Sequence, residues 1–461
     1  MTAFTPAAEI AAAVASGRTT ASAVMTACLD RIERLNPVLN AFTAVLADRA
    51  RTRAAVVDAS RKPKGPLAGV PFAVKNLIDI KGLPTLAGSK INRDDPPATA
   101  DAPLIGRLEA AGAILVGALN MGEYAYDFTG ENAHDGPSRN PHDTVRMSGG
   151  SSGGSGSAVG GGLVPLALGS DTNGSIRVPA SFCGLFGLKP TYGRLTRAGS
   201  FPFVSSLDHL GPLARTTTDL ALAYDAMQGY DAADPVCVDR PADPVAGRLN
   251  SGLSGLRIAS AGGYFRAGAS PEALAALDVV AAALAASETI TIPEAQRARS
   301  AAYIITATEG AALHLDRLRT RPDDFDADVR DRLIAGTLIP AAAVMQAQKF
   351  RRWYRDEVLK LFQHVDAVLA PATPCVAPLI GQKTFVLDGK EMPLRPNIGV
   401  YTQPISFIGL PVVAVPLPTA AGLPIGVQII TAPWREDLAL RIARTLEASG
   451  VAAAPLPKLE G

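Results

Sequence analysis

The fold of this protein is decided by Gly149-Gly-Ser-Ser-Gly-Gly-Ser-Gly-Ser157 and by the apolar run Leu163-Val-Pro-Leu-Ala-Leu168 that follows it. Gly/Ser composition is typical of a flexible linker, but a linker seldom leads straight into a run that belongs in a core. A Gly-rich turn can also hold phosphate, yet no GxxxxGK[ST] motif is present, and residues 139–146 before the stretch are loop-like rather than a strand. We favour a third interpretation, in which closely packed glycines bring serine hydroxyls and amides together on a small buried ligand.

Outside this stretch, apolar segments of strand length alternate with segments of helical spacing. The strand-like segments are residues 67–74, 113–116, 163–168, 256–259, 289–292, 367–369, 412–415 and 425–430. The helix-like segments are residues 7–16, 20–35, 102–111, 217–227, 271–286 and 436–449. We expect Asn36-Pro37 to end the second helix. Strands interleaved with helices predict an α/β fold with a central, largely buried sheet.

The domain organisation follows from the length of the chain and from its composition. A chain of 461 residues can form one large domain or two ordinary ones. We find no internal repeat and expect a single domain over residues 1–461. Residues 231–253 are rich in Pro, Asp and Gly, and they are the best candidate for a surface excursion or a subdomain seam.

Charge and hydropathy argue against several classes of protein. The chain has 44 Lys and Arg against 43 Asp and Glu, a net charge of +1, which argues against a nucleic-acid-binding face. The basic clusters at residues 51–53 and 351–352 fit solvated helix faces. No apolar run reaches the roughly 18 to 20 residues of a membrane span, and residues 1–10 do not resemble a secretory signal. We therefore expect a cytoplasmic protein with no membrane or nucleic-acid partner.

Cysteine and histidine usage argues against disulfides, metals and a histidine-based triad. The cysteines lie far apart with no CxxC pair, which fits a reduced cytoplasm. They are Cys28, Cys183, Cys237 and Cys375. The histidines show no metal-binding spacing, and no GxSxG motif with a downstream Asp and His is evident. We expect neither a metal nor a cofactor, and we expect each histidine to be a surface residue or a support behind a site. They are His134, His142, His209, His314 and His364.

A lysine is the remaining candidate for a base that could activate a serine. Lys75 ends the apolar run Val70-Pro-Phe-Ala-Val74, which would draw its ammonium into a poorly solvated setting. Burial favours the neutral amine and lowers the pKa of a lysine by up to about 3 to 5. The residues alone leave a second interpretation open, a lysine at the end of a strand that reaches solvent.

Several segments carry a resemblance to a known family. Gly169-Ser-Asp-Thr-Asn-Gly-Ser-Ile-Arg-Val-Pro-Ala-Ser181 closely resembles a serine motif of the amidase signature family. Residues 149–154 resemble the serine motif that precedes it, and Gly69-Val-Pro-Phe-Ala-Val-Lys75 is similar to the family's lysine motif. Residues 187–191 and 426–428 also match, so the resemblance spans nearly the whole chain. It implies the amidase signature fold, a single large domain with a central mixed β-sheet covered by helices.

The resemblance also implies a catalytic relay of Lys75, Ser151 and Ser175. The intervals between them, 76 and 24 residues, are those of the family. Ser175 resembles the nucleophile that accepts the acyl group, Ser151 the bridging serine held by a cis peptide bond, and Lys75 the base. Neutral Lys75 would take a proton through Ser151 from Ser175, which attacks the amide carbon, releases ammonia and leaves an acyl-enzyme for water to hydrolyse.

An oxyanion hole of backbone amides is implied by the same resemblance. Its residues would be Thr172, Asn173, Gly174 and Ser175. The family usually has glycine at the position of Asn173. Asn tolerates unusual backbone angles, so the hole can survive this difference while the pocket beside it changes.

Within the family, the chain most resembles the branch that deaminates 1-carboxybiuret to urea-1,3-dicarboxylate in cyanuric acid breakdown. This resemblance is carried by residues 87–93, 168–191, 221–229 and 402–406. It implies a small-amide substrate, an oligomer and a small accessory subunit similar to the small subunit of the tRNA-dependent amidotransferases.

Candidate substrate contacts follow from the charge of such a substrate. A carboxylated substrate needs a cation, and the candidates are Arg93, Arg177 and Arg197. Arg177, two residues after Ser175, is equally consistent with a structural strut. We also name Tyr126 and Asp127 as residues that line the pocket, with plain packing as the alternative interpretation. Gly149 and Gly150 are further candidate substrate contacts.

Two alternatives to this function remain open on the sequence. The first is the glutaminase subunit of a tRNA-dependent amidotransferase, which shares the relay and would need an ATP-using partner and a path for ammonia. The second is a catalytically dead homologue that acts as a binding module, which the retention of Lys75, Ser151 and Ser175 disfavours.

Overall fold

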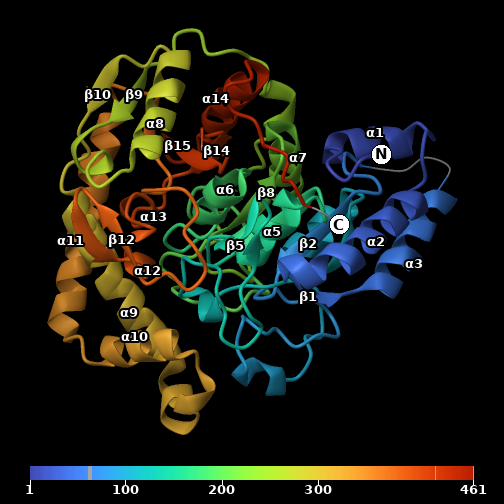
Figure 1. Cartoon of the computed structure of the whole chain (residues 1–461), viewed down its shortest axis with the longest axis horizontal. Coiled ribbons are helices and arrows are strands. Elements are labelled where there is room, and N and C mark those ends of the chain that lie inside the picture. The colour runs from blue at the N-terminus through green and yellow to red at the C-terminus, as the bar shows by residue number, and fades with distance from the viewer. Residues whose placement is uncertain (61–64, 421, 460–461) are drawn as a thin grey trace.

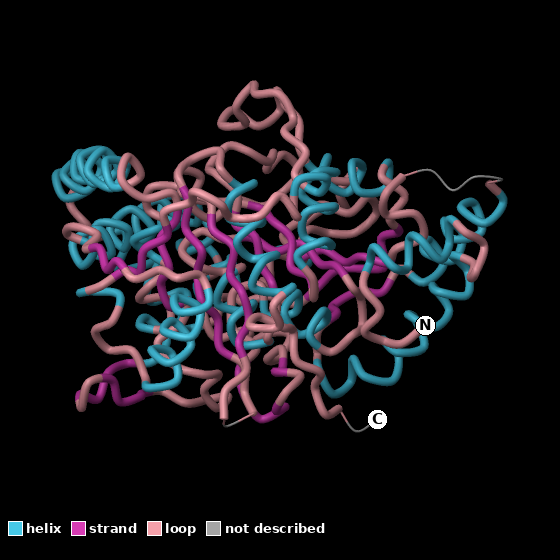
Figure 2. The backbone as a smooth tube through the Cα atoms, turned by 90° about the horizontal axis from the view of Figure 1, so that it is seen from above, coloured by secondary structure: helices cyan, strands magenta, loops and turns pink. Residues whose placement is uncertain are grey.

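The chain is built around one long β-sheet. A computed structural model describes residues 1–60, 65–420 and 422–459. Within them, eleven strands form a sheet in the order β1-β3-β2-β6-β8-β7-β14-β15-β11-β9-β10. Figures 1 and 2 show these strands crossing the middle of the molecule with helices around them. The strands are β1 Phe42–Val45, β2 Pro71–Lys75, β3 Ile114–Leu119, β6 Leu166–Ser170, β7 Phe186–Lys189, β8 Leu210–Ala214, β9 Ile258–Ala261, β10 Glu288–Ile290, β11 Ala367–Pro371, β14 Val412–Leu417 and β15 Ile425–Thr431.

The sheet is mixed, and this confirms the expected fold class of a single α/β domain. Strand β2 runs parallel to β3 and to β6, and β9 runs parallel to β10 and β11. The strands between these two groups pair antiparallel, from β6 through β8, β7, β14 and β15 to β11. Every residue of β2, β3 and β6 is buried, which is why these strands read as continuous apolar runs.

Helices cover the sheet and extend it at both ends. They are α1 Ala7–Ala15, α2 Ala21–Leu39, α3 Ala47–Ala59, α4 Pro103–Ala110, α5 Gly153–Gly160, α6 Arg177–Cys183, α7 Thr217–Met227, α8 Pro271–Ala283, α9 Ala295–Thr320, α10 Ala327–Thr337, α11 Ala341–Leu361, α12 Leu394–Asn397, α13 Gln403–Ser406 and α14 Glu436–Ala448. Helices α1 to α3 lie at one end of the molecule and α9 to α11 at the other (Figure 1). No helix in the described ranges is long and apolar enough to cross a membrane.

The elements predicted from periodicity are present, with shifted ends. All six predicted helices and all eight predicted strands have a counterpart in the described residues. Two apolar runs were predicted to start too early, because residues 67–70 and 163–165 form turns, bends and irregular chain before β2 and β6 begin. The sequence analysis assigned no element to residues 295–361, which form the long helices α9, α10 and α11.

Helix α2 does not end at Asn36-Pro37, and that expectation was wrong. The helix continues to Leu39 with Pro37 inside its last turn. Proline removes the hydrogen bond to the carbonyl four residues earlier, but Pro37 and Glu33 both lie on the exposed face, where water can satisfy that carbonyl. The helix ends instead at Asn40, which has the left-handed φ of 49°.

The Gly/Ser stretch contains a buried helix, α5, that glycine content would disfavour. Its glycines are required by close backbone contacts. A Cβ on Gly154 would lie 2.5 Å from the carbonyl oxygen of Ala41 and from backbone atoms of Asn120. A Cβ on Gly160 would lie 2.7 Å from Pro141. Packing therefore overrides helix propensity here.

Residues 139–146 were expected to form a loop, and this was wrong. They form a small antiparallel pair, β4 Arg139–Asn140 with β5 Asp143–Met147. The side chain of Asn140 accepts a hydrogen bond from the amide of His142, an Asx turn that reverses the chain. A second small pair joins β12 Thr384–Leu387 to β13 Lys390–Pro393.

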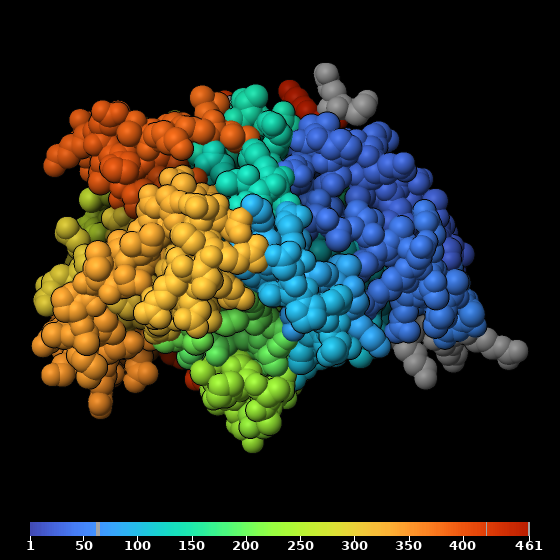
Figure 3. All heavy atoms as spheres, turned by 90° about the horizontal axis from the view of Figure 1, so that it is seen from below, coloured from blue at the N-terminus to red at the C-terminus, as the bar shows by residue number. Residues whose placement is uncertain are grey.

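The segment after α7 projects from the body of the molecule and is lime green in Figure 3. Residues 231–253 contain one short 3-10 turn, Ala246–Arg248. The segment is tied back to the domain, because Arg197 pairs with Asp234 at 3.0 Å and Val245 is buried. Whether it marks a seam between subdomains stays a prediction.

The close contacts of α5 predict a large loss of stability for Gly154→Ala. Overpacking a core costs about 1–3 kcal/mol, and here the added atom meets backbone that cannot turn away. We expect a loss of about 3 kcal/mol in the free energy of unfolding, measured by urea titration. Gly106→Ala in α4 is the control, because open space surrounds Gly106. It should gain up to about 1 kcal/mol, and equal effects of the two changes would contradict the packing argument.

Candidate active site

The centre of the site is the buried amine of Lys75, the last residue of β2. Its side chain is fully buried. The Nζ lies 2.6 Å from the Oγ of Ser151, 2.8 Å from that of Ser170 and 3.1 Å from that of Ser152. These hydroxyls replace the water that burial removes from the amine.

The sheet explains why two of these residues meet. Lys75 and Ser170 are the carboxyl-terminal residues of β2 and β6, which are parallel neighbours. The carboxyl ends of parallel strands share one edge of a sheet, where α/β proteins place their ligands. Ser152 then joins the cluster through Ser170, with its Oγ 3.1 Å from the carbonyl oxygen of Ser170.

Burial determines the protonation of the lysine. Loss of solvation lowers the pKa of Lys75 from 10.5 to about 7. The negative charges of Asp208, Asp171 and Asp127 oppose this shift and only partly offset it. A substantial fraction of the amine is therefore neutral near pH 7 and able to accept a proton.

Ser151 reaches the lysine from a tightly packed turn. The peptide bond between Gly150 and Ser151 is cis, as the resemblance implied. A Cβ on Gly150 would lie 2.4 Å from an oxygen of Asp127, so only glycine fits. That carboxylate accepts hydrogen bonds from the amides of Thr129 and Gly130. Gly150 thus packs against a neighbouring turn, whereas a Cβ on Gly149 would lie 2.9 Å from Pro179 of α6.

Ser175 lies in the loop between β6 and α6, and it is nearly buried, with 3% of its surface exposed. It lines a cavity together with Tyr126 and Asn173. In the part of the chain that the structure describes, no hydrogen bond joins Ser175 to Ser151. The structure therefore links Lys75 to Ser151 and places Ser175 at the cavity wall.

The loop before Ser175 presents unused backbone donors. Among the described residues, the N–H groups of residues 172–175 make no hydrogen bond to a protein acceptor. A buried N–H normally has a partner, so four free donors in succession suit a negatively charged oxygen. Gly174 has a φ of 142°, which favours glycine, and a Cβ there would lie 2.2 Å from the Oγ of Thr402.

The three arginines proposed for a substrate carboxylate all bind protein carboxylates. Arg177 is fully buried, with its Nε and Nη2 each 3.0 Å from the carboxylate of Asp171, the contacts of a strut. Arg93 pairs with Asp135 at the surface. Arg197, which pairs with Asp234, lines a neighbouring hollow that also reaches Ser170.

Two arginines that the sequence analysis missed line the cavity of Ser175. They are Arg332 of α10 and Arg395 of α12. Arg395 is balanced by ion pairs to Asp127 at 2.9 Å and to two further carboxylates at 3.2 Å. Arg332 makes no ion pair among the described residues. No motif signalled either residue, because both lie far along the chain from the serine motifs.

Arg332 is held in the cavity wall by contacts that leave its charge uncompensated. Its guanidinium carbon lies 3.9 Å from the centre of the Tyr126 ring, a cation–π contact. The Nη2 donates to the carbonyl of Tyr126, and the Nε donates to that of Asp328 at 2.6 Å. The Nη1 makes no hydrogen bond within the described residues.

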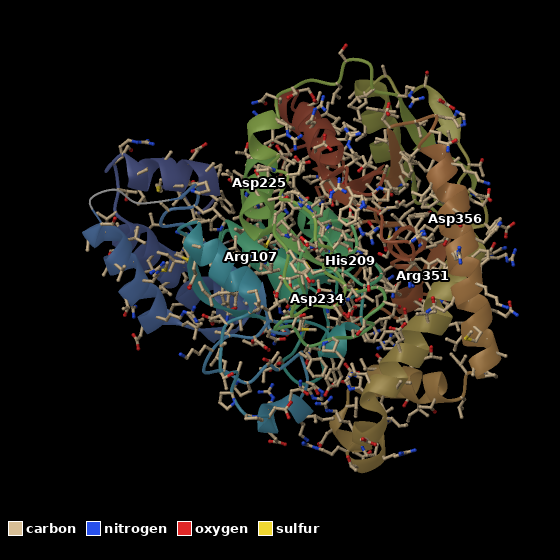
Figure 4. The ribbon with its side chains drawn as sticks, turned by 180° about the vertical axis from the view of Figure 1, so that it is seen from behind. Arg107, His209, Asp225, Asp234, Arg351 and Asp356 are labelled. Carbon is tan, nitrogen blue, oxygen red and sulfur yellow. The ribbon has the colours of Figure 1, made fainter. Side chains whose placement is uncertain are left out.

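Two histidines, His209 and His314, lie deep in the protein, so the expectation of a surface position was wrong for both. His314 is fully buried against the ring of Tyr124 at 3.9 Å, and burial lowers its pKa to about 3. His209 lies in the middle of the molecule (Figure 4). Its Nδ1 lies 3.0 Å from the carbonyl oxygen of Asp171, the residue before the loop at residues 172–175. Within the described residues, no group of three His, Cys, Asp or Glu side chains could hold a metal ion.

The cation clusters of the sequence lie on helices, and one of them is not simply solvated. Residues 51–53 belong to α3 and residues 351–352 to α11. Arg351 is half-buried and donates to the carbonyls of Phe407 and Ser206, each at 2.6 Å.

All four cysteines are free thiols.

Comparison with known proteins places these motifs in a wider context. The family model described as Amidase matches residues 23–440. The chain is 55% identical to AtzE, a subunit of the 1-carboxybiuret hydrolase of Pseudomonas sp. (strain ADP), over 96% of this chain and 98% of that protein. It is 38% identical to the A subunit of the glutamyl-tRNA(Gln) amidotransferase of Azotobacter vinelandii (strain DJ / ATCC BAA-1303), over 95% of each.

Solved structures give the same picture. A structure described as an unexpected vestigial protein complex, which reveals the evolutionary origins of an s-triazine catabolic enzyme, has a TM-score of 0.97 and 54% identity. The match covers 98% of this chain and all of that one. The A subunit of the glutamyl-tRNA(Gln) amidotransferase of Thermotoga maritima has a TM-score of 0.81 and 31% identity, over 96% and 95% of the two chains.

The lowered pKa of Lys75 predicts a pH-dependent stability. The unfolded chain holds the proton of this lysine up to about pH 10.5, while the folded protein releases it near pH 7. The cost of burying the lysine is thus largest below pH 7 and fades towards pH 10.5. We expect Lys75→Met to unfold at higher urea than the wild type at pH 7, with a difference that shrinks as pH rises. Lys349→Met, at an exposed lysine, is the control and should show no such trend.

Proposed function

This chain belongs to the amidase family and is an amide C–N hydrolase, and we propose that it acts through a relay of Lys75, Ser151 and Ser175. The observation that carries the proposal is the fully buried amine of Lys75, 2.6 Å from the Oγ of Ser151. A neutral amine at that distance can accept the serine proton.

The chemistry of the relay follows from these positions. Ser175 loses its proton to Ser151, which passes its own proton to Lys75, and the Ser175 oxygen attacks the amide carbon. The negative charge that develops on the carbonyl oxygen is taken up by the free N–H groups of residues 172–175, and each such donor contributes about 2.7–4 kcal/mol. The proton returns to the leaving nitrogen, ammonia departs, and water hydrolyses the acyl-enzyme.

We propose 1-carboxybiuret as the substrate, with urea-1,3-dicarboxylate and ammonia as products. The 55% identity to a 1-carboxybiuret hydrolase subunit supports this choice. The cavity adds a physical argument, because Arg332 offers an uncompensated positive charge to the substrate carboxylate. A guanidinium binds a carboxylate through two parallel N–H groups, and its Nη1 is free for one of them.

Asn173 supports a substrate that carries N–H groups next to the scissile carbonyl. Its Nδ2 donates to Thr306 at 3.0 Å, while its Oδ1 is buried without a hydrogen-bond partner among the described residues. An unpaired buried acceptor costs about 1–3 kcal/mol, so a ligand donor that pairs with it would be favoured. A ureide supplies such a donor.

The glutaminase subunit of a tRNA-dependent amidotransferase is the second candidate. The 38% identity to the A subunit of such an enzyme favours it, and glutamine also carries a carboxylate.

We further propose a cytoplasmic, oligomeric enzyme with a small accessory subunit, supported by the solved relative described as a complex. Purification with partners from the native host, followed by ammonia assays on 1-carboxybiuret and on glutamine, tests both candidates. Ammonia from glutamine alone would overturn the proposed substrate.

The relay predicts the behaviour of its variants. Ser175→Ala should abolish labelling by a fluorophosphonate and all release of ammonia, and Lys75→Ala should lower kcat by at least about a thousandfold. In the wild type, kcat/KM should fall tenfold per pH unit below about pH 7, where Lys75 becomes protonated. Ser157→Ala is the control, because Ser157 donates only to the carbonyl of Arg139. Near-normal activity in Ser175→Ala would remove the mechanism.

The free charge of Arg332 predicts a substrate-dependent effect. Arg332→Met keeps the stem and removes the charge, which costs about 1.5–3 kcal/mol of binding and raises KM for 1-carboxybiuret by roughly 10- to 150-fold. Kinetics with biuret, which lacks the carboxylate, should be unchanged. Arg330→Met, on the same helix and paired with Asp331, serves as the control. An equal effect on both substrates would show that Arg332 does not bind the carboxylate.

A further inference from the structure

We infer that Thr402 and His209 are positioning residues that aim the backbone donors of the loop at residues 172–175. The inference rests on the proposed oxyanion role of this loop. Among the described residues, Thr402 and His209 contact this segment without lining the cavity of Ser175.

The geometry of a trans peptide links the two sides of the loop. Its C=O and N–H are fixed in one plane and point in opposite directions. A hydrogen bond that holds the carbonyl of one residue therefore also sets the direction of the next residue's N–H. A loop can aim its donors at a ligand by anchoring its carbonyls on the far side.

The first anchored peptide joins Asp171 to Thr172. The carbonyl of Asp171 accepts two hydrogen bonds from His209, one from its backbone N at 3.1 Å and one from its Nδ1 at 3.0 Å. The amide of Asp171 donates to the carbonyl of His209 at 2.8 Å. With the carbonyl held on this side, the N–H of Thr172 points the other way.

The two ring contacts of His209 show which of its nitrogens carries the proton. Its Nζ lies 3.2 Å from the Nε2 of His209, and both side chains are buried. The carbonyl oxygen of Asp171 can only accept a hydrogen bond, so the proton of the neutral ring is on Nδ1, and Nε2 is the acceptor that faces Lys189. Burial keeps the ring neutral, because it lowers the pKa of His209 well below its usual value.

The second anchored peptide joins Asn173 to Gly174. The hydroxyl of Thr402, which is fully buried, donates to the carbonyl of Asn173 at 2.6 Å. The N–H of Gly174 therefore points away from Thr402. The missing side chain of Gly174 is what admits this hydroxyl, since a Cβ there would lie 2.2 Å from the Thr402 Oγ.

The neighbouring peptides complete the pattern. The carbonyl of Gly174 accepts from the amide of Val178 at 2.8 Å, so the first turn of α6 aims the N–H of Ser175. The carbonyl of Thr172 accepts no hydrogen bond in the described chain, so no such contact fixes the direction of the N–H of Asn173. Three donors of four are thus set by partners outside the cavity.

Thr402→Val tests the inference, because valine has nearly the same shape and lacks the hydroxyl. An oxyanion donor that loses its aim should lower kcat by roughly 10- to 100-fold with little change in KM, since the charge develops only in the transition state. The rate of fluorophosphonate labelling of Ser175 should fall in parallel. Thr402→Ser keeps the hydroxyl and should restore kcat to within a few fold of the wild type.

Thr431→Val is the matched control. Thr431 is also fully buried, and its hydroxyl donates to the carbonyl of Arg435 at 3.0 Å, far from the loop in sequence. An unchanged kcat in Thr402→Val, or an equal fall in Thr431→Val, overturns the inference. Should Thr402→Val not fold, Thr402→Cys has a weaker donor and must give an intermediate kcat.

Variants of His209 test the inference independently, at the peptide that joins Asp171 to Thr172. His209→Asn can place an amide N–H near the position of Nδ1, whereas His209→Leu cannot. We expect a fall in kcat in the leucine variant and partial recovery in the asparagine variant, with KM little changed in both. Equal kcat in the two variants contradicts the inference. Wild-type protein that neither reacts with the fluorophosphonate nor releases ammonia would contradict the proposed function instead.

Discussion

The burial of one amine, that of Lys75, constrains the structure around it. A charged ammonium in a dry interior is costly, so the site must offer hydroxyls to the amine and tolerate its neutral form. Ser151, Ser152 and Ser170 supply those hydroxyls from two segments that meet at one edge of the sheet. To bring Ser151 that close, the chain must run through Gly150 without a side chain, and α5 must pack backbone against backbone. The unusual composition of residues 149–157 follows from this requirement.

A second constraint is the buried ion pair of Asp171 and Arg177. Both side chains are fully buried, and the guanidinium also donates to the side chain of Gln428 at 2.6 Å and to that of Ser406. A buried pair is stable only when its remaining donors and acceptors are satisfied, as they are here. The pair joins the loop after β6 to α13 and β15, so the loop at residues 171–176 is fixed by segments that are distant in the sequence.

The sequence predicted the parts of the structure that local pattern determines. Alternating apolar runs predicted the strands around Lys75, and the motifs pointed to Lys75 and Ser151, whose side chains lie 2.6 Å apart. The relay through Ser175 stays a prediction. Local pattern failed where distant contacts decide, as in α5, whose glycines are set by Ala41 and Asn120. Arg332 could not be identified from the sequence, because what distinguishes it is that no carboxylate lies beside it among the described residues. Arg395 looks the same in sequence, yet three acidic side chains neutralise it.

The cavity has two walls of separate origin. The wall that carries Ser175 and its free N–H groups belongs to the central sheet and its loops, whereas the wall that carries Arg332 belongs to α10, in the helical end of the molecule. Helices α9 to α11 pack mainly on one another and form a distinct region at that end (Figure 3). Natural variation can therefore remodel the helical wall without disturbing the loop that carries Ser175. Such a division of labour allows one scaffold to diversify among many amides while its chemistry stays unchanged.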